Sequence, residues 1–443
     1  MNPSVSSASE GITLHLGLFF DGTGLNLYNQ QQGASGLSNA TGSYATGQSN
    51  VARLYALYPH QASCALAADA RHAALALYIE GIGTRCGEAD SMLAQATGRH
   101  DSGVLATLER VPAQVAALLA GFLQHNPSRT IQTIEIDLFG FSRGAAAARH
   151  FANDFDQGPQ SRLAKACPGY PLRINFIGLF DTVAAIWAPH KGNFSVANQD
   201  FDGLQQGLRE GIARQVVQLV AADEWRQNFP LVASDNDILL PGAHTDIGGG
   251  YLPEELECLL LERPFSSLEP RNLPVPDSQA WRQASQRLEQ QRQAWEAMGL
   301  HLRIDCQSVD EPFLAKRDLQ RQKRVWARIF GERRVRGELS LVYLRLMHAL
   351  AVRGAVPLMP VPDSAELALP AELHGIAEKL QAYGLGDTAV HGLDEVQMDL
   401  LRRRYIHVSA HWNGPSQANS PLLDGLFVHR PADAGQRVIF PNR

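Results

Sequence analysis

The stretch that decides the fold is Ile131-Gln-Thr-Ile-Glu-Ile-Asp-Leu-Phe-Gly-Phe-Ser-Arg-Gly144, which leads into the alanines of 145–148. Its first half is rich in isoleucine and leucine and predicts a strand, whereas the proline-free segment 144–151 predicts a helix. A Gly-x-Ser-x-Gly sequence at such a junction is typical of a nucleophile elbow, a strained turn that exposes the serine hydroxyl. The alternative is a glycine-bracketed strand end at which Ser142 only caps the helix.

Apolar runs elsewhere in the chain alternate with helical segments, as they do in a parallel sheet covered by helices. They predict strands over 12–20, 73–79, 172–180 and 238–240, in addition to the strand before Ser142. A helical periodicity at 111–122 stops at Asn126-Pro127. The sequence therefore predicts an α/β fold that is α/β-hydrolase-like, with a mostly parallel sheet flanked by helices and with a helical cap or insertion.

The cap is expected after Tyr251, where the sequence changes character. We predict a catalytic core over 1–252, a helical cap or insertion over 253–337, and a C-terminal part over 338–443 that completes the core. The cap contains a polar segment, 279–298, with a helical pattern, and then a basic stretch, 316–336. Such a stretch is usually a solvated helical face, and the alternative is a surface that meets lipid headgroups. The apolar segment 339–358 predicts a buried helix.

Composition limits the classes of function. The formal net charge of -6 gives no general attraction to nucleic acid, and no nucleic-acid partner is expected. No apolar stretch free of charges approaches the roughly 18 to 20 residues that cross a bilayer. Residues 1–11 lack the pattern of a secretory signal peptide, so we expect synthesis in the cytoplasm. The five scattered cysteines are expected to be free thiols and buried small side chains, and no zinc-binding spacing is present.

A nucleophilic serine needs a base that accepts its proton and an acid that orients the base. Asp181 and His244 follow Ser142 in the chain order of α/β hydrolases, and each comes directly after a predicted strand. Parallel strands end at one edge of the sheet, so the three side chains are expected to meet there. Each has a structural alternative, because Asp181 also fits a turn cap and His244 a turn histidine.

The sequence also offers other acids and histidines for these roles. Asp246 is a rival acid, although a residue two positions after the histidine more naturally supports the loop; Asp223 and Glu224 are weaker rivals. His150 lies eight residues after Ser142 on the same predicted helix, roughly 12 Å along its axis, which is too far for the base. The fallback bases are His407 and His411, both expected in a late strand.

The oxyanion hole is predicted to use the main-chain N–H of Arg143 and one from the loop Asp21-Gly-Thr-Gly24, either that of Gly22 or that of Thr23. Asp21 and Asn26 are expected to hold this loop. The mechanism needs no metal ion or other cofactor. A phosphatase nucleophile motif, Asp-x-Asp-Gly-Thr, is disfavoured because Phe19 occupies its first position.

Four motifs together resemble the class one phospholipase effectors of bacterial type VI secretion. They are Phe19-Phe-Asp-Gly-Thr-Gly-Leu-Asn26, Gly140-Phe-Ser-Arg-Gly144, Phe180-Asp-Thr-Val183 and Pro241-Gly-Ala-His-Thr-Asp-Ile-Gly-Gly-Gly-Tyr251. The resemblance spans about residues 12–252, with weaker similarity at 405–412. It implies an α/β hydrolase with Ser142 as nucleophile, Asp181 as orienting acid and His244 as base.

The same resemblance implies phospholipase A activity through an acyl-enzyme, on membrane phospholipids of rival bacteria. It also implies delivery to the periplasm of the target cell, a spike component of the secretion system as partner, and a cognate immunity protein. Two alternatives stay open. The triad could serve an esterase or thioesterase with a soluble acyl substrate, or the chain could be a secretion-associated binding protein with a vestigial hydrolase site.

Overall fold

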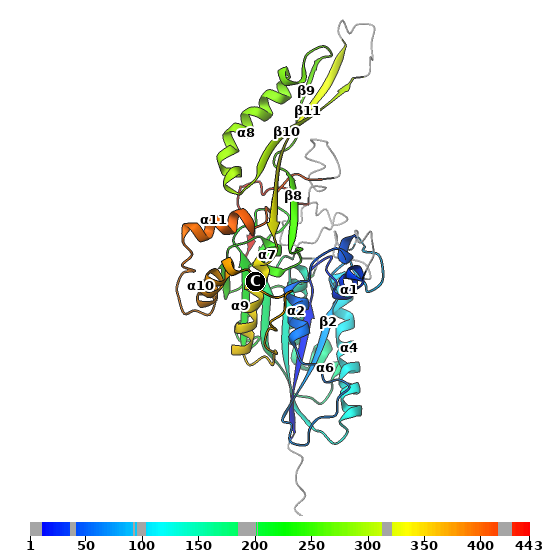
Figure 1. The fold of residues 1–443 in the computed structure, drawn as a ribbon. Helices are drawn as coiled ribbons and strands as arrows, with labels where there is room; N and C mark the ends of the chain where they lie inside the picture. The colour runs from blue at the N-terminus through cyan, green and yellow to red at the C-terminus, as the bar shows by residue number, and fades with distance from the viewer. Residues whose placement is uncertain are drawn as a thin grey trace, which may run out of the picture.

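The computed structural model describes residues 11–35, 41–91, 94, 103–184, 201, 203–311, 321–414 and 428–443. Its centre is a six-stranded sheet in the order β2-β1-β3-β4-β5-β7, with every neighbouring pair parallel (Figure 1). The strands are β1 (Ile12–Phe20), β2 (His72–Ile79), β3 (Ile131–Phe141), β4 (Leu172–Phe180), β5 (Gln215–Ala221) and β7 (Asp237–Leu240). The α/β-hydrolase-like fold class predicted from the sequence is confirmed, and β5 is a strand that the sequence analysis missed.

Helices cover both faces of this sheet, which is why its strands read as nearly continuous apolar runs. On β1, Leu14, Leu16 and Leu18 belong to the core on the side of α4 and α5, while Phe19 belongs to the core that includes α2 and α9. The helices around the sheet are α1 (Leu27–Ala34), α2 (Asn50–Leu57), α4 (Val104–His125), α5 (Arg143–Phe155), α6 (Arg162–Ala166) and α9 (Leu339–Arg353). The buried helix predicted over 339–358 is therefore confirmed as α9, which ends five residues earlier.

One helix of the described chain, α4, is long and apolar enough to cross a membrane by length and composition. Its face formed by Leu108, Val111, Val115 and Phe122 is buried in the core of the sheet. In the fold, α4 thus occupies the position of a core helix that covers β2 and packs against α5 and α6.

The segment after the core forms an arm that projects from the sheet (Figure 1). It was predicted to be helical, and only α8 (Gln279–Ala297) bears this out. The remainder is an antiparallel sheet in which β11 (Gln322–Arg336) pairs with β10 (His301–Asp310) along one edge and with β8 (Glu254–Leu260) and β9 (Phe265–Pro270) along the other. On β11, Val325, Ala327 and Ile329 are buried against α8, so the apolar residues recur at the period of two expected of a strand.

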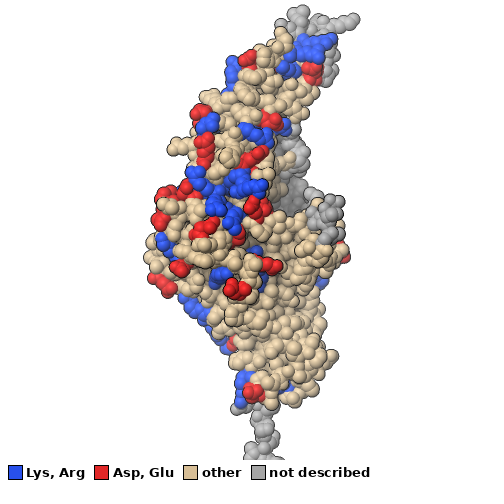
Figure 2. Space-filling model, viewed as in Figure 1, with Lys and Arg blue, Asp and Glu red and all other residues tan. Residues whose placement is uncertain are grey.

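The basic stretch is therefore strand where it is described, and the prediction of a solvated helical face was wrong; Lys316 and Arg317 lie outside the described residues. Its arginines face carboxylates: Arg324 lies 2.7 Å from Glu311, Arg328 2.8 Å from Asp305 and Arg333 2.7 Å from Glu257. Figure 2 shows the same pattern over the arm, with acidic and basic side chains interspersed. This pairing disfavours the lipid-headgroup alternative, which needs cations that lack protein partners.

The C-terminal part returns to the core. After α9 come α10 (His374–Gly384) and α11 (Glu395–Arg404), and the chain ends beside the sheet, where β12 (Ile439–Phe440) pairs in parallel with β6 (Leu231–Val232). Residues beyond 428 thus lie next to the segment that follows β5.

The cysteines divide between surface and interior. All five are free, and Cys167 is buried, whereas Cys64, Cys86 and Cys258 are exposed. The expectation that they serve as buried small side chains was wrong for these three, because each lies in a loop or on a strand face that the core does not cover.

The sheet also buries a carboxyl group, and this leads to a prediction about pH. Asp137 accepts hydrogen bonds from the Tyr58 hydroxyl (2.8 Å) and from the Asn175 amide (2.7 Å). Burial raises the pKa of Asp137 to about 7, against these two hydrogen bonds, which lower it. Because the unfolded value is about 3.9, the contribution of this group to stability is complete below pH about 4 and is lost as the pH rises to about 7.

Replacing Asp137 by asparagine should remove this dependence, because the amide cannot ionise. Thermal melts of both proteins at pH 5 and pH 8 would measure it: the Tm of Asp137→Asn relative to that of the native chain should be higher at pH 8 than at pH 5. The exposed Asp69 provides the control, since Asp69→Asn should track the native chain. An Asp137→Asn protein whose Tm stays at a fixed distance from the native value at both pH values would contradict the prediction.

Candidate active site

Ser142 lies at a sharp turn between β3 and α5. Its backbone has φ 57° and ψ -124°. Residues other than glycine rarely adopt this conformation, and it commonly marks functional sites. The glycines around it are required by close approach, because a Cβ on Gly140 would lie 2.6 Å from the Cα of Ala145, and one on Gly144 would lie 2.2 Å from the Phe20 carbonyl oxygen. The local geometry is that of a nucleophile elbow.

Asp181 and His244 form a buried pair beside this turn. Phe180, the last residue of β4, is in register with Phe141, so Asp181 and Ser142 follow neighbouring strand ends. His244 is the first residue of α7 (His244–Gly248), and its Nδ1 lies 2.6 Å from Asp181 Oδ2. The structure thus brings together the acid and the base that were predicted from the sequence.

The helix that carries His244 packs directly on the residue before the nucleophile. The rings of His244 and Phe141 have centroids 4.6 Å apart, and a Cβ on Gly248 would lie 2.1 Å from the Phe141 ring. Only glycine at position 248 lets α7 approach this closely. No hydrogen bond joins the Ser142 hydroxyl to His244 within the described chain; in hydrolases this bond often forms only when substrate is bound.

The electrostatics of the pair suit an orienting acid and a base. Burial by itself raises the pKa of Asp181, but the Arg437 guanidinium and the His244 ring outweigh it and hold the pKa below its usual value. Burial lowers the pKa of His244, and the neighbouring Asp181 offsets this only in part. At neutral pH the carboxylate is therefore charged and the imidazole neutral, the state in which the free Nε2 can accept a proton.

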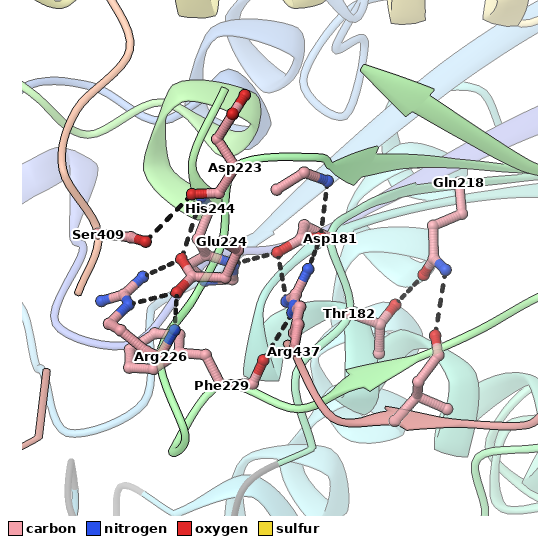
Figure 3. Close-up of polar contacts among 12 residues, drawn as sticks. Asp181, Thr182, Gln218, Asp223, Glu224, Arg226, Phe229, His244, Ser409 and Arg437 are labelled. Carbon is pink, nitrogen blue, oxygen red and sulfur yellow. Dashed lines mark hydrogen bonds and ion pairs between the residues drawn. The ribbon is translucent and has the colours of Figure 1, made fainter. Parts of the chain in front are cut away.

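Arg437 is a residue of this site that the sequence analysis missed. Its two terminal nitrogens donate to the two carboxylate oxygens of Asp181, each at 2.8 Å, and its Nε donates to the Phe229 carbonyl at 2.8 Å (Figure 3). The Ala221 N–H donates to Asp181 as well, at 3.0 Å. No local motif could have shown this contact, because Arg437 lies 256 residues after Asp181.

A second buried ion pair supports His244 from the other side. Glu224, one of the weaker rival acids, accepts the main-chain N–H of His244 at 3.3 Å and pairs with Arg226 at 2.7 Å, so it holds the backbone of His244 and not its ring (Figure 3). The Arg226 guanidinium lies over the Phe229 ring, 3.3 Å from its centroid, and the Phe229 and His244 rings meet in a T-shaped contact with centroids 5.2 Å apart. The other weaker rival, Asp223, accepts the Gly242 N–H at 2.7 Å.

The main rival acid, Asp246, binds a different histidine. It accepts the Ala243 N–H at 2.9 Å, which closes the first turn of α7, and it accepts both the main-chain N–H of His407 (3.0 Å) and its Nδ1 (2.7 Å). Asp246 thus ties the loop to the C-terminal part, and the fallback base His407 lies on Asp246 and not on Asp181. The other fallback base, His411, stacks on His429, with ring centroids 4.6 Å apart.

His150, which the sequence analysis excluded as base, accepts the Gln205 N–H at 3.0 Å. His407 and His411 were also expected in a late strand, and this was wrong, because residues 405–414 form no regular strand.

The predicted oxyanion loop is held by Asp21 and Asn26, and only one of its two candidate amides has no partner in the described chain. Asp21 accepts the Tyr78 hydroxyl at 2.5 Å and the N–H of Gly22 at 2.7 Å, while Asn26 caps α1. The Gly22 N–H therefore already has a partner within the loop and is not free to bind an oxyanion. The main-chain N–H groups of Thr23 and Arg143 have no partner among the described residues, and the Arg143 Nε donates to the Thr23 hydroxyl at 2.6 Å. Of the two loop candidates, the geometry favours Thr23.

The described residues contain no group of three or more histidine, cysteine, aspartate or glutamate side chains placed to hold a metal ion. The groups gathered around Ser142 are a carboxylate, an imidazole and main-chain amides. Together they can abstract a proton from the hydroxyl and stabilise a developing oxyanion.

Comparison with known proteins agrees with this site. Residues 153–268 match the family described as T6SS, phospholipase effector Tle1-like, catalytic domain; this range includes Asp181 and His244 and begins after Ser142. No curated protein matches the chain. An uncharacterized protein from Pseudomonas aeruginosa is a distant structural match, with 19% identity, a TM-score of 0.42, and coverage of 86% of this chain and 52% of that one.

A much stronger match is the Tle1 effector in its structure bound to the VgrG spike from the Type 6 secretion system. It has a TM-score of 0.77 and 29% sequence identity, and the alignment covers 98% of this chain and 94% of that one. The likeness thus includes the core, the arm and the C-terminal part. In fold and in sequence, this chain resembles the Tle1-like, class one phospholipase effectors of the type VI secretion system.

Proposed function

We propose that this chain is a serine-dependent phospholipase A that acts as an antibacterial type VI secretion effector on membrane phospholipids. The observation that carries the proposal is the buried Asp181–His244 pair, 2.6 Å apart, packed against Phe141 at the turn that bears Ser142. The Tle1-like match supports the substrate class.

The mechanism follows from the positions of these groups. His244 accepts the proton of Ser142 as its hydroxyl oxygen attacks the acyl carbonyl, and Asp181 stabilises the imidazolium that forms. The N–H groups of Arg143 and Thr23 bind the oxyanion. His244 then donates the proton to the oxygen of the departing lysophospholipid, which leaves an acyl-enzyme on Ser142. A water molecule activated by His244 hydrolyses this ester and releases the fatty acid.

Fatty-acid release from mixed phospholipid vesicles, labelled separately at each acyl position, tests this function. We expect the native chain to release label from one position in preference to the other, which would also assign the A1 or A2 type. A short-chain soluble ester is assayed beside it. Cleavage of the soluble ester without any release from vesicles would reject the phospholipase and favour an esterase on a soluble substrate.

The remaining alternative is a vestigial site, and active-site labelling addresses it separately. A fluorophosphonate probe should label Ser142 in the native chain, because the reaction needs the hydroxyl activated by His244. A chain that neither cleaves any ester nor reacts with the probe would be a binding protein.

The proposal extends to delivery and partners. The structural relative is bound to a VgrG spike, and its likeness over 98% of this chain supports a spike component as the carrier here. We further propose that the chain reaches the periplasm of target bacteria and that a cognate immunity protein protects the producer. Expression with and without a periplasmic leader checks the compartment: toxicity confined to the cytoplasmic form would overturn it.

A further inference from the structure

Arg143 lies between the nucleophile and the oxyanion loop. It follows Ser142 directly, and its Nε donates to the Thr23 hydroxyl at 2.6 Å. This bond fixes the plane of the guanidinium beside the position at which the substrate carbonyl must lie. The two terminal nitrogens have no hydrogen-bond partner in the described chain, and the residue is partly exposed.

Other arginines near the site have partners for both terminal nitrogens. Arg437 pairs with Asp181 and Arg226 with Glu224, while Arg149 donates to carbonyl and amide oxygens around Gln218. Arg143 differs, because no ion pair of the described residues includes it and no nearby charge shifts its pKa. Burial alone lowers the pKa of Arg143 to about 10, so the side chain is still a cation at neutral pH.

This position is unfavourable for a cation without a ligand. Arg143 is the first residue of α5, where the partial positive charge of a helix N-terminus opposes another positive charge. Partial burial adds a desolvation cost that no carboxylate offsets. An anion in the substrate would remove both costs, and the planar guanidinium matches the paired oxygens of a phosphodiester.

We propose that the Arg143 side chain binds the phosphodiester anion of the substrate and thereby selects phospholipids over neutral glycerides. This rests on the proposed function, since it names the substrate group that the same site recognises. The main-chain N–H of Arg143 serves the oxyanion, and its side chain serves the headgroup. One residue thus fixes the distance between the scissile ester and the phosphate.

The first test compares kcat/KM for a phospholipid with that for the diacylglycerol of the same acyl chains, both in mixed micelles. The ratio of the two values should fall about 10- to 100-fold in Arg143→Gln, the range for loss of a charge-assisted hydrogen bond. Arg143→Lys keeps the charge, and its ratio should lie between those of the native chain and Arg143→Gln. Thr23→Val removes only the hydrogen bond that holds Nε, and it should lower the ratio less than Arg143→Gln does, because the cation stays in place.

An unchanged ratio in Arg143→Gln, whether both activities fall together or neither does, would overturn the proposal and leave Arg143 as a support of the oxyanion loop. Melting curves of each variant show whether it is folded, and Arg143→Lys carries the test if Arg143→Gln is not.

A second measurement separates this proposal from the proposed function. Glycerol 3-phosphate should inhibit hydrolysis of a soluble neutral ester by the native chain, and Arg143→Gln should lose this inhibition. Glycerol at the same concentration is the uncharged control. If the native chain cleaves the ester but no phospholipid, the proposed function fails, and inhibition that depends on Arg143 would still establish an anion site. Inhibition that is absent, or equal in both proteins, would reject the site.

Discussion

Replacing Ser142 by alanine is expected to lower kcat for ester hydrolysis by about 10⁴- to 10⁶-fold, because in the proposed mechanism its hydroxyl carries the acyl chain between the two half-reactions. The remaining groups bind the substrate and the oxyanion but offer no nucleophile. Release of fatty acid from labelled vesicles and hydrolysis of a short ester should fall together, since both use the same acyl-enzyme.

The fold should survive this change. Ser142 makes its hydrogen bonds to neighbouring strands through its main chain, with its N–H donating to the Phe180 carbonyl at 3.1 Å, and alanine keeps that bond. The melting temperature should therefore stay close to the native value. Ser364→Ala, at an exposed loop position, is the matched control and should keep full activity. Residual turnover above about a tenth of the native rate in Ser142→Ala would exclude Ser142 as the nucleophile, since loss of that group costs several orders of magnitude.

Replacing Arg437 by methionine is the second change with a large expected effect. It leaves the carboxylate of Asp181 buried without its cation, which costs about 3 to 5 kcal/mol of folding stability in comparable buried pairs. Asp181 would also lose the two contacts that fix its plane, and misplaced catalytic groups commonly cost about 10²-fold in kcat/KM. Arg437→Lys, which keeps the charge but not the paired geometry, should lose less of both.

The pH profile of kcat/KM distinguishes a role of Arg437 in positioning Asp181 from a general loss of stability. In the proposed mechanism His244 must be neutral to accept the Ser142 proton, so the acidic limb of kcat/KM should report the pKa of His244. Arg437 neutralises the carboxylate beside this ring, and without it the negative charge of Asp181 favours the imidazolium. The acidic limb should therefore move to higher pH in Arg437→Met.

A matched control is Arg149→Met, which removes another buried guanidinium that makes no contact with Asp181. It should lower the melting temperature and leave the limb in place. If both variants lose activity without moving the limb, the role of Arg437 is structural only.

Local patterns in the sequence were enough to place the scaffold of the site. The apolar runs of β1 and β4 and the glycines around Ser142 carry their information within about ten residues, because strand periodicity and close backbone approach are local constraints. Parallel strands end at one edge of a sheet, so the order Ser142, Asp181, His244 predicted that the acid and the base would meet beside the elbow. The pair at 2.6 Å agrees with that prediction of position.

Local patterns failed where the environment decided the structure. On β11, five arginines among fifteen residues masked a strand, because only packing against α8 shows which side chains are buried. The strand β5 carries the buried polar residue Gln218, which hydrogen-bonds to Thr182, Arg149 and Asp237, and this interrupts the apolar run by which a strand is recognised.

The sequence by itself thus determined the parallel sheet, the elbow at Ser142 and the chain order of the candidate acid and base. Only the tertiary structure decided which partners those groups receive. It pairs Arg437 with Asp181 and His407 with Asp246, and it occupies the Gly22 amide, whereas the Thr23 amide has no partner in the described chain. The reason is physical: a side chain's charge and hydrogen bonds are satisfied by whatever folding brings within about 3 Å, and that neighbour can lie hundreds of residues away.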